Sequence, residues 1–201
     1  MGLRERKKQA TRRALRDAAV GLTLEHGLED VTVEEIAAAA DVSTRTFFNY
    51  FTTKEDALLG DLPVGPDEEE LRAFVDGRPT GEFTEDLVTL LVDSLVDTED
   101  LDSQREDMKL HHRLIEREPQ LLPGLLARFH DVEVCLGKAV AERLRVGYED
   151  DRPQLVAAVA MSVVRNTTQE LYAAGDDPVD VADKIRNAFR ALGEIFGARS
   201  N

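Results

Sequence analysis

The stretch VTVEEIAAAADVSTRTFF, which begins at residue 31, constrains the fold most, because it holds two helix-start signals close together. Thr32 stands three positions before Glu35, the spacing of a capping box in which each side chain bonds the backbone amide of the other residue. Ser43, after the alanine-rich run, offers a second N-cap. The sequence therefore predicts two short helices, one beginning at Thr32 and one spanning 44–50, with a tight turn between them.

The second of these helices has an aromatic side and a polar side. At helical spacing, Phe47 and Phe51 point inward. Thr44, Arg45 and Asn49 point outward. Two short helices joined by a turn of a few residues match the helix-turn-helix, whose second helix enters the major groove and presents its N-terminal side chains to base edges. This stretch thus predicts a DNA-binding unit.

These residues resemble the signature of the TetR-type bacterial repressors, V-S-x-x-T-h-Y-x-Y-F-x-x-K-E, in which h is apolar. The matching residues are Val42, Ser43, Thr46, Phe47, Tyr50, Phe51, Lys54 and Glu55. The order of parts matches too, since a basic first helix, a T-x-x-E helix and the signature precede roughly 140 residues of helical chain. Phe48 departs from the pattern, because the family often has tyrosine there, and we transfer no phosphate contact to it.

The resemblance implies an all-α, TetR-like fold with two domains. Residues 1–52 would form the helix-turn-helix DNA-binding domain, and residues 53–201 a larger helical domain that binds an effector and dimerises. We expect a repressor that binds a palindromic double-stranded operator as a homodimer and is released by a small, partly apolar ligand of unknown identity. The alternative is a DNA-binding regulator without a small-molecule effector, controlled by a protein partner.

Eight polar residues are candidates for contact with DNA. They are Thr32, Ser43, Thr44, Arg45, Thr46, Asn49, Tyr50 and Lys54. Arg45 would form the bidentate contact with guanine that is the commonest base-specific pairing. Lys54, at the start of the next helix, would bind a phosphate together with the Tyr50 hydroxyl.

The net charge of −15 is unevenly distributed along the chain. The first sixteen residues hold seven basic side chains and one acidic side chain, whereas residues 55–201 hold sixteen basic and thirty-two acidic ones. Salt screens charges over roughly 8 to 10 Å at physiological ionic strength, so a duplex would respond mainly to the basic end. A solvated tail is the simpler interpretation of a basic end taken alone, and the signature beside it favours DNA.

Helical patterns fill the rest of the chain. We expect a first helix over 5–26 ended by Gly27, linkers at 63–70 and 76–82, and helices at about 84–97, 101–118, 121–147, 153–174 and 178–197. The run LVAAVAMSVV, residues 155–164, is apolar nearly all round, so protein must cover several of its faces. The helices 153–174 and 178–197 are the predicted homodimer interface, and burial of both within a monomer is the alternative. A helix that begins near Thr53 would act as the lever for ligand release.

Polar residues that follow the apolar run could contact an effector. Asn166 and Tyr172 would project into the interior of the domain and bond the ligand, unless the helix emerges into solvent there. His112 is a third candidate for ligand binding. Its spacing to Glu116 indicates a surface pair, which supplies too few ligands for a dedicated zinc site.

Other functional classes lack support in the sequence. It holds no glycine-rich phosphate loop, closed set of metal ligands or recognisable Ser, His and Asp spacing, so we expect no enzyme, cofactor or metal. No segment reaches the roughly eighteen apolar residues of a membrane span, and the first residues lack an apolar stretch, so we expect a cytoplasmic protein with no membrane partner. Cys135 is the one cysteine and is expected in the core.

Overall fold

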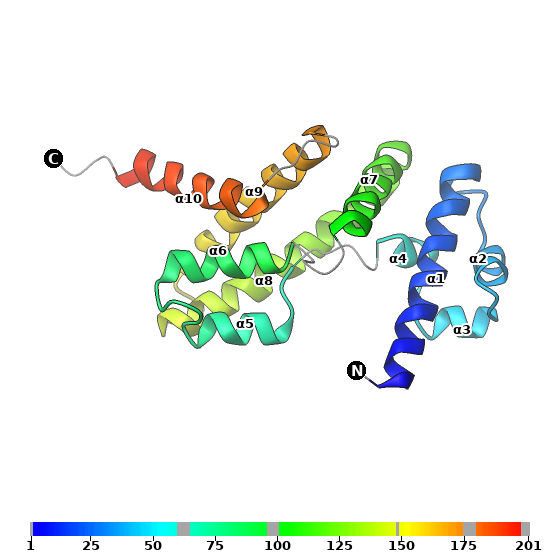
Figure 1. Ribbon diagram of the computed structural model, residues 1–201, viewed down its shortest axis with the longest axis horizontal. Coiled ribbons are helices and arrows are strands. Elements are labelled where there is room, and N and C mark those ends of the chain that lie inside the picture. Colours follow the sequence, from blue (N-terminus) through cyan, green and yellow to red (C-terminus); the bar gives the residue numbers. More distant parts are fainter. Residues whose placement is uncertain (1, 60–64, 96–100, 148, 175–179, 198–201) are drawn as a thin grey trace. The chain divides into compact units, whose positions relative to one another are not determined.

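The computed structural model describes residues 2–59, 65–95, 101–147, 149–174 and 180–197 (Figure 1). Within these ranges the chain forms ten α-helices and one short 3-10 helix, and it forms no strand. The predicted all-α fold is confirmed. No helix in the described part of the chain is long and apolar enough to cross a membrane.

The chain packs into two compact units. The first comprises Met1–Leu62 with Arg105–Leu126, and the second comprises Pro63–Gln104 with Ala127–Asn201. The predicted boundary after residue 52 divides a DNA-binding domain from an effector-binding domain, and this division by function stays a prediction. As a packing unit, however, the first unit continues beyond that point and includes a segment from much later in the chain.

The first unit surrounds the predicted helix-turn-helix. It contains α1 (Leu3–His26), α2 (Val33–Ala39), α3 (Thr44–Phe48), α4 (Lys54–Leu59), the later part of α7 (Leu101–Arg117), the 3-10 helix η1 (Pro119–Leu121) and the start of α8 (Leu122–Leu144). The helix α1 ends where the sequence predicts, because the Gly27 amide donates to the Thr23 carbonyl at 2.9 Å. Glycine suits this position, since its φ is 92°.

The second unit is a helical bundle. It contains α5 (Glu68–Val75), α6 (Phe83–Asp93), the remaining parts of α7 and α8, α9 (Asp151–Ala174) and α10 (Val181–Gly197). The helix α10 packs against α6 and α9. Leu91, Leu136 and Ile185 are fully buried in the core that these helices share with α8.

The helix α5 corrects the predicted linker at 63–70. The Asp67 carboxylate accepts the Glu70 amide at 2.8 Å, and the Glu70 carboxylate accepts the Asp67 amide at 2.7 Å. This capping box starts α5 at Glu68, so the linker prediction is wrong for the second half of that range. The predicted linker at 76–82 is confirmed, since α5 ends at Val75 and Gly77 follows with a φ of 79°.

The apolar run on α9 is only partly covered within one chain. Ala157 and Ala160 are buried in the second core, and Met161 is buried as well. Leu155, by contrast, is 63% exposed and Val159 is 41% exposed. One side of the run therefore faces solvent in the single subunit.

Cys135 lies on the exposed side of α8. The side of α8 that enters the core carries Leu136, Ala139 and Val140, all of which are buried. Adjacent residues of a helix point about 100° apart, so a residue beside a buried leucine need not be buried itself. The expected core position of Cys135 is therefore wrong.

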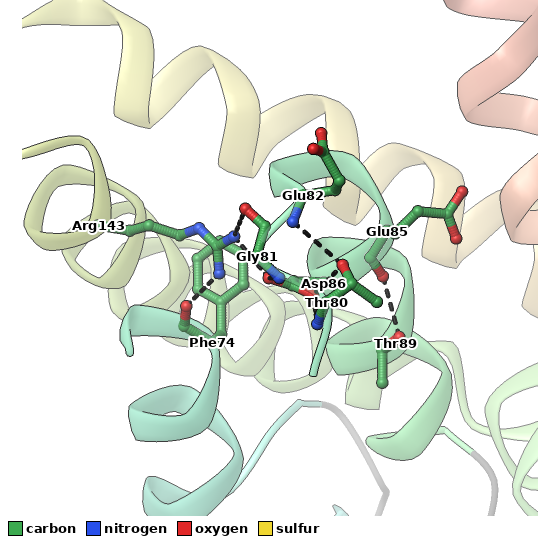
Figure 2. Close-up of polar contacts among 8 residues, drawn as sticks. All are labelled: Phe74, Thr80, Gly81, Glu82, Glu85, Asp86, Thr89 and Arg143. Carbon is green, nitrogen blue, oxygen red and sulfur yellow. Dashed lines mark hydrogen bonds and ion pairs between the residues drawn. The ribbon is translucent and has the colours of Figure 1, made fainter. Parts of the chain in front are cut away.

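A buried ion pair joins α6 to α8 in the second unit (Figure 2). The Arg143 guanidinium donates to the Asp86 carboxylate at 2.6 Å, and the Asp86 side chain is fully buried. Asp86 also accepts the amide of Thr80 at 2.8 Å and its hydroxyl at 2.7 Å. Arg143 in turn donates to the Phe74 carbonyl and lies 4.6 Å from the centroid of the Phe74 ring. The pair thereby fastens the 76–82 loop to three helices.

Hydrogen bonding decides the ionisation of Asp86. Burial alone would raise the pKa of Asp86, but hydrogen bonds from Thr80 and Arg143 outweigh it, and the pKa lies below its ordinary value. The carboxylate is therefore charged at neutral pH, as its pairing with Arg143 requires.

Candidate DNA-binding surface

The first helix of the helix-turn-helix starts at the predicted capping box. The Thr32 hydroxyl accepts the Glu35 amide at 3.2 Å, and the Glu35 carboxylate accepts the Thr32 amide at 2.9 Å. The bond from the Thr32 amide, followed by that from its hydroxyl, lowers the pKa of Glu35. The Thr32 side chain is thus engaged in starting α2, and its predicted contact with DNA stays a prediction.

The turn between α2 and α3 is fixed by backbone hydrogen bonds. Asp41 adopts the left-handed conformation with a φ of 54°, which aspartate tolerates better than most residues. The Val42 amide then donates to the Ala37 carbonyl at 2.9 Å, as in a Schellman motif. Ser43 starts α3 as predicted, because its hydroxyl accepts the Thr46 amide at 3.1 Å.

The outward side of α3 carries most of the predicted base contacts. Arg45 and Asn49 are exposed, and Thr44 is half-buried. The hydroxyls of Ser43 and Thr46 lie 2.9 Å apart, and either can be the donor. One of the two hydroxyl protons therefore remains for an outside acceptor such as a phosphate. The helix itself ends at Phe48, earlier than the predicted residue 50.

Aromatic side chains hold α3 from behind. Phe47 is fully buried and Phe51 is 2% exposed, which confirms both as core residues. Their ring centroids lie 5.7 Å apart. The Arg12 guanidinium of α1 lies 4.7 Å from the centroid of the Phe51 ring. Phe47 thus packs α3 against the core, and Arg12 of α1 contacts Phe51, which lies three residues beyond the end of α3.

Lys54 and Tyr50 have partners within the first unit. The Lys54 ammonium donates to the Leu28 carbonyl and, at 2.9 Å, to the Val31 carbonyl. These bonds use two of its three N–H groups. Tyr50 is half-buried and packs against the core of the first unit. The phosphate contacts of both residues stay predictions, and the structure adds a stabilising role for Lys54.

The corner between α7 and α8 completes the core of the first unit. Leu114 and Leu121 are buried in the same cluster as Phe47. No local signal could have placed residues 105–126 there, because their partners lie far away in the sequence. The unit that contains the predicted helix-turn-helix therefore does not consist of the N-terminal helices alone.

One buried carboxylate ties this corner to the segment before α2. Glu118, which is 7% exposed, accepts the Leu28 amide at 3.1 Å. The Leu28 carbonyl accepts from Lys54, so this one residue is held from two sides. Gln120 donates to the second Glu118 oxygen at 2.6 Å. A displacement of the corner would consequently pull on the segment that leads into the helix-turn-helix.

The predicted effector contacts belong to different units. His112 lies exposed in the first unit, 3.3 Å from Glu116, which confirms the predicted surface pair. Asn166 is exposed on α9 and donates to Glu170 at 3.0 Å, so its predicted projection into the interior is wrong. That side of α9 faces solvent, as the alternative held. The side chain of Tyr172 lies outside the described residues, and an effector contact by any of the three stays a prediction.

Two family models together match most of the chain. Residues 15–59 match the model described as bacterial regulatory proteins, tetR family. Residues 85–197 match the model described as the MftR C-terminal domain. The first match contains the whole helix-turn-helix, and the second contains most of α6 and the helices that follow it up to residue 197.

Curated relatives agree with these models. Over 184 residues the chain is 35% identical to the HTH-type transcriptional regulator TcmR of Streptomyces glaucescens, an alignment that covers 89% of this chain and 80% of TcmR. It is 25% identical over 190 residues to a protein of Mycobacterium tuberculosis named as the mycofactocin biosynthesis transcriptional regulator MftR, with 94% and 92% of the two chains covered.

Solved structures also match, at lower similarity. The fatty acid degradation regulator FadR of Bacillus halodurans has a TM-score of 0.46 and 22% identity, covering 90% of this chain and 93% of that one. A TetR/AcrR-family regulator of Thermobifida fusca has a TM-score of 0.44 and 18% identity, covering 90% and 95%. The assignment to a family rests on the two family models, which describe domains of transcriptional regulators, and on TcmR, which is a transcriptional regulator and not an enzyme. The chain belongs to the TetR family of bacterial transcriptional regulators.

Proposed function

We propose that this regulator is a repressor that binds a palindromic operator as a homodimer and leaves it when a small, partly apolar ligand binds. The observation that carries the proposal is the outward side of α3, where Arg45 and Asn49 are exposed while Phe47 is fixed in the core. A helix held in this way presents the same side chains to every duplex, as base reading needs.

Basic residues of α1 supply the attraction to the DNA backbone. The exposed ones are Arg4, Arg6, Lys7, Lys8 and Arg13. Arg12 of the same helix lies over Phe51, three residues beyond the end of α3, so this basic helix runs close to the recognition helix. Phosphate contacts from α1 position the protein, and base contacts from α3 supply the sequence preference.

Selection of binding sites from a random DNA pool by the full chain tests the operator proposal. We expect two inverted copies of one half-site, with centres roughly 34 to 36 Å apart or a multiple of that distance. A selected site with a single copy, or with a direct repeat, contradicts a symmetric dimer on a palindrome. A pool that shows no enrichment contradicts base reading altogether.

Exposed apolar side chains on the last two helices support the dimer. Leu155 and Val159 lie one helical turn apart on α9, and Ile195 on α10 is 67% exposed. The two helices pack against each other, so both can contribute to one surface. A second copy of this surface would bury these side chains, in line with the predicted interface of helices 153–174 and 178–197.

Charge placed on this surface tests the interface. The double variant Leu155→Glu, Val159→Glu should sediment as a monomer at concentrations where the unchanged protein is a dimer, and it should lose operator affinity. Leu144→Glu is the matched control, because Leu144 is 39% exposed on α8, outside the proposed interface. A double variant that dimerises as the control does would refute the interface.

Ligand release needs a connection between the effector domain and α3. The lever expected from the sequence begins near Thr53, but α4 belongs to the first unit, where Ala57 and Leu58 are fully buried. The helices α7 and α8 both continue from the second unit into the first. We therefore assign the release to the corner between them, whose Glu118 bonds the Leu28 amide.

A thermal-shift screen of small apolar compounds, followed by operator titration, tests this route. A tenfold to hundredfold release requires a ligand to prefer the released form by about 1.4 to 2.8 kcal/mol, and the operator must weaken ligand binding equally. Glu118→Ala should keep ligand binding and lose part of the release. If every stabilising compound leaves operator affinity unchanged, the effector-free alternative replaces the proposal.

A further inference from the structure

Phe48 is an exposed side chain of α3 to which the proposed function assigns no role. It is 57% exposed, although it is a large apolar residue on a helix whose other phenylalanine is fully buried. It lies one helical turn after Arg45 and Thr44, on the outward side of α3. An apolar ring is thus presented beside the polar groups that are proposed to read bases.

The ring of Phe48 is held in place by the core behind it. Its centroid lies 5.4 Å from that of Phe47, and the two ring planes are at 87°, an edge-to-face contact. Phe47 in turn contacts Phe51, and both are core residues. The Phe48 ring is therefore a supported apolar surface, and its position on α3 depends little on DNA.

The major groove offers such a ring a specific partner. Each base pair presents hydrogen-bonding groups there, and thymine adds an apolar one, its 5-methyl group. Phenylalanine has no hydroxyl with which to bond a phosphate, so it gains little from the DNA backbone. Contact with a thymine methyl removes apolar surface of both partners from water.

We propose that Phe48 reads the methyl group of a thymine in each operator half-site, close to the base pair that Arg45 contacts. The proposal rests on the proposed docking of α3 in the major groove. Three residues of an α-helix span about 4.5 Å, and neighbouring base pairs are about 3.4 Å apart. The thymine therefore lies within one or two base pairs of the Arg45 contact.

Deoxyuridine in place of thymine tests this directly, because it removes only the 5-methyl group. The thymines of the selected operator are replaced one position at a time, symmetrically in both half-sites, and Kd is measured with the full chain. At one position near the Arg45 contact we expect roughly a fourfold loss per half-site, the affinity equivalent of burying one methyl group. Phe48→Ala should bind the thymine and uridine operators equally.

Two further variants separate methyl reading from other roles. Phe48→Tyr keeps the ring and should retain the preference for thymine at that position. Asn49→Ala, an exposed neighbour of Phe48 and itself a predicted DNA contact, should change the affinity for the thymine and uridine operators by the same factor. Circular dichroism of Phe48→Ala should match that of the unchanged protein, because the side chain is not a core residue.

The outcomes distinguish this inference from the function on which it rests. If the protein binds its operator selectively and no uridine substitution weakens binding, the methyl contact is refuted and the repressor proposal stands. If Phe48→Ala weakens operator and random DNA equally, Phe48 contacts the backbone and the inference is again refuted. If the unchanged protein selects no operator, the proposed function fails, and the inference fails with it.

Discussion

Replacement of Lys54 by methionine tests whether this side chain stabilises the protein or binds DNA. Its ammonium group donates to the carbonyls of Leu28 and Val31, and the side chain is half-buried. A hydrogen bond from a charged donor contributes about 1.5 to 3 kcal/mol, and partial exposure places each of these near the lower limit. Lys54→Met should therefore lower the free energy of unfolding of the first unit by about 3 kcal/mol.

Urea unfolding with hydrogen–deuterium exchange measures this loss and locates it in the first unit. Lys138→Met is the matched control, because Lys138 is exposed on α8 and its replacement removes the same charge. Where both variants are folded, a salt titration of operator affinity should give the same slope for each. Unchanged stability of Lys54→Met with a slope reduced by about one unit would refute this reasoning and establish the phosphate contact expected from the sequence.

Further predictions concern the two cores. Asp86→Ala should lower the free energy of unfolding of the second unit by about 3 to 5 kcal/mol in a urea titration, because it leaves Arg143 buried without its partner. Arg186→Ala, which breaks an exposed ion pair with Glu85, is the control and should cost less than about 1 kcal/mol. Because folding lowers the pKa of Asp86, its contribution to the free energy of unfolding is complete above the ordinary value of 3.8 and is lost as the pH falls through the lower pKa of the folded state. The stability of Asp86→Asn should therefore depend less on pH in this acid range than that of the unchanged protein. Phe47→Ala should cost about 3 to 5 kcal/mol and abolish operator binding, with exchange protection in the second unit retained.

Local signals were sufficient for the helix-turn-helix. The capping box of Thr32, the N-cap at Ser43 and the glycine that ends α1 depend on residues a few positions apart, and each lies where it was predicted. The start of α5 carries the same kind of signal, Asp67 followed by Glu70, within a stretch whose proline and glycine favoured a linker. Where a capping box stands beside proline and glycine, the capping box is therefore the better predictor of where a helix starts.

Partners distant in the sequence could not be predicted in this way. A lysine at the start of a helix suits a phosphate and a carbonyl equally, since both accept its N–H groups, and only the fold decides that Lys54 bonds Leu28. The tie between Glu118 and Leu28 spans 90 positions. Periodicity also failed to orient α9, because a run that is apolar nearly all round has no distinct polar side, and Asn166 was placed on the wrong one.

Base reading by α3 is tested most directly by the affinity of Arg45→Ala for the selected operator and for random DNA. The variant should lose about 1 to 3 kcal/mol on the operator and bind random DNA with unchanged affinity and salt slope. Arg6→Ala, an exposed arginine of α1, is the matched control and should weaken both DNAs alike. If Arg45→Ala instead weakens operator and random DNA equally, Arg45 contacts only the backbone, and base reading by α3 is contradicted.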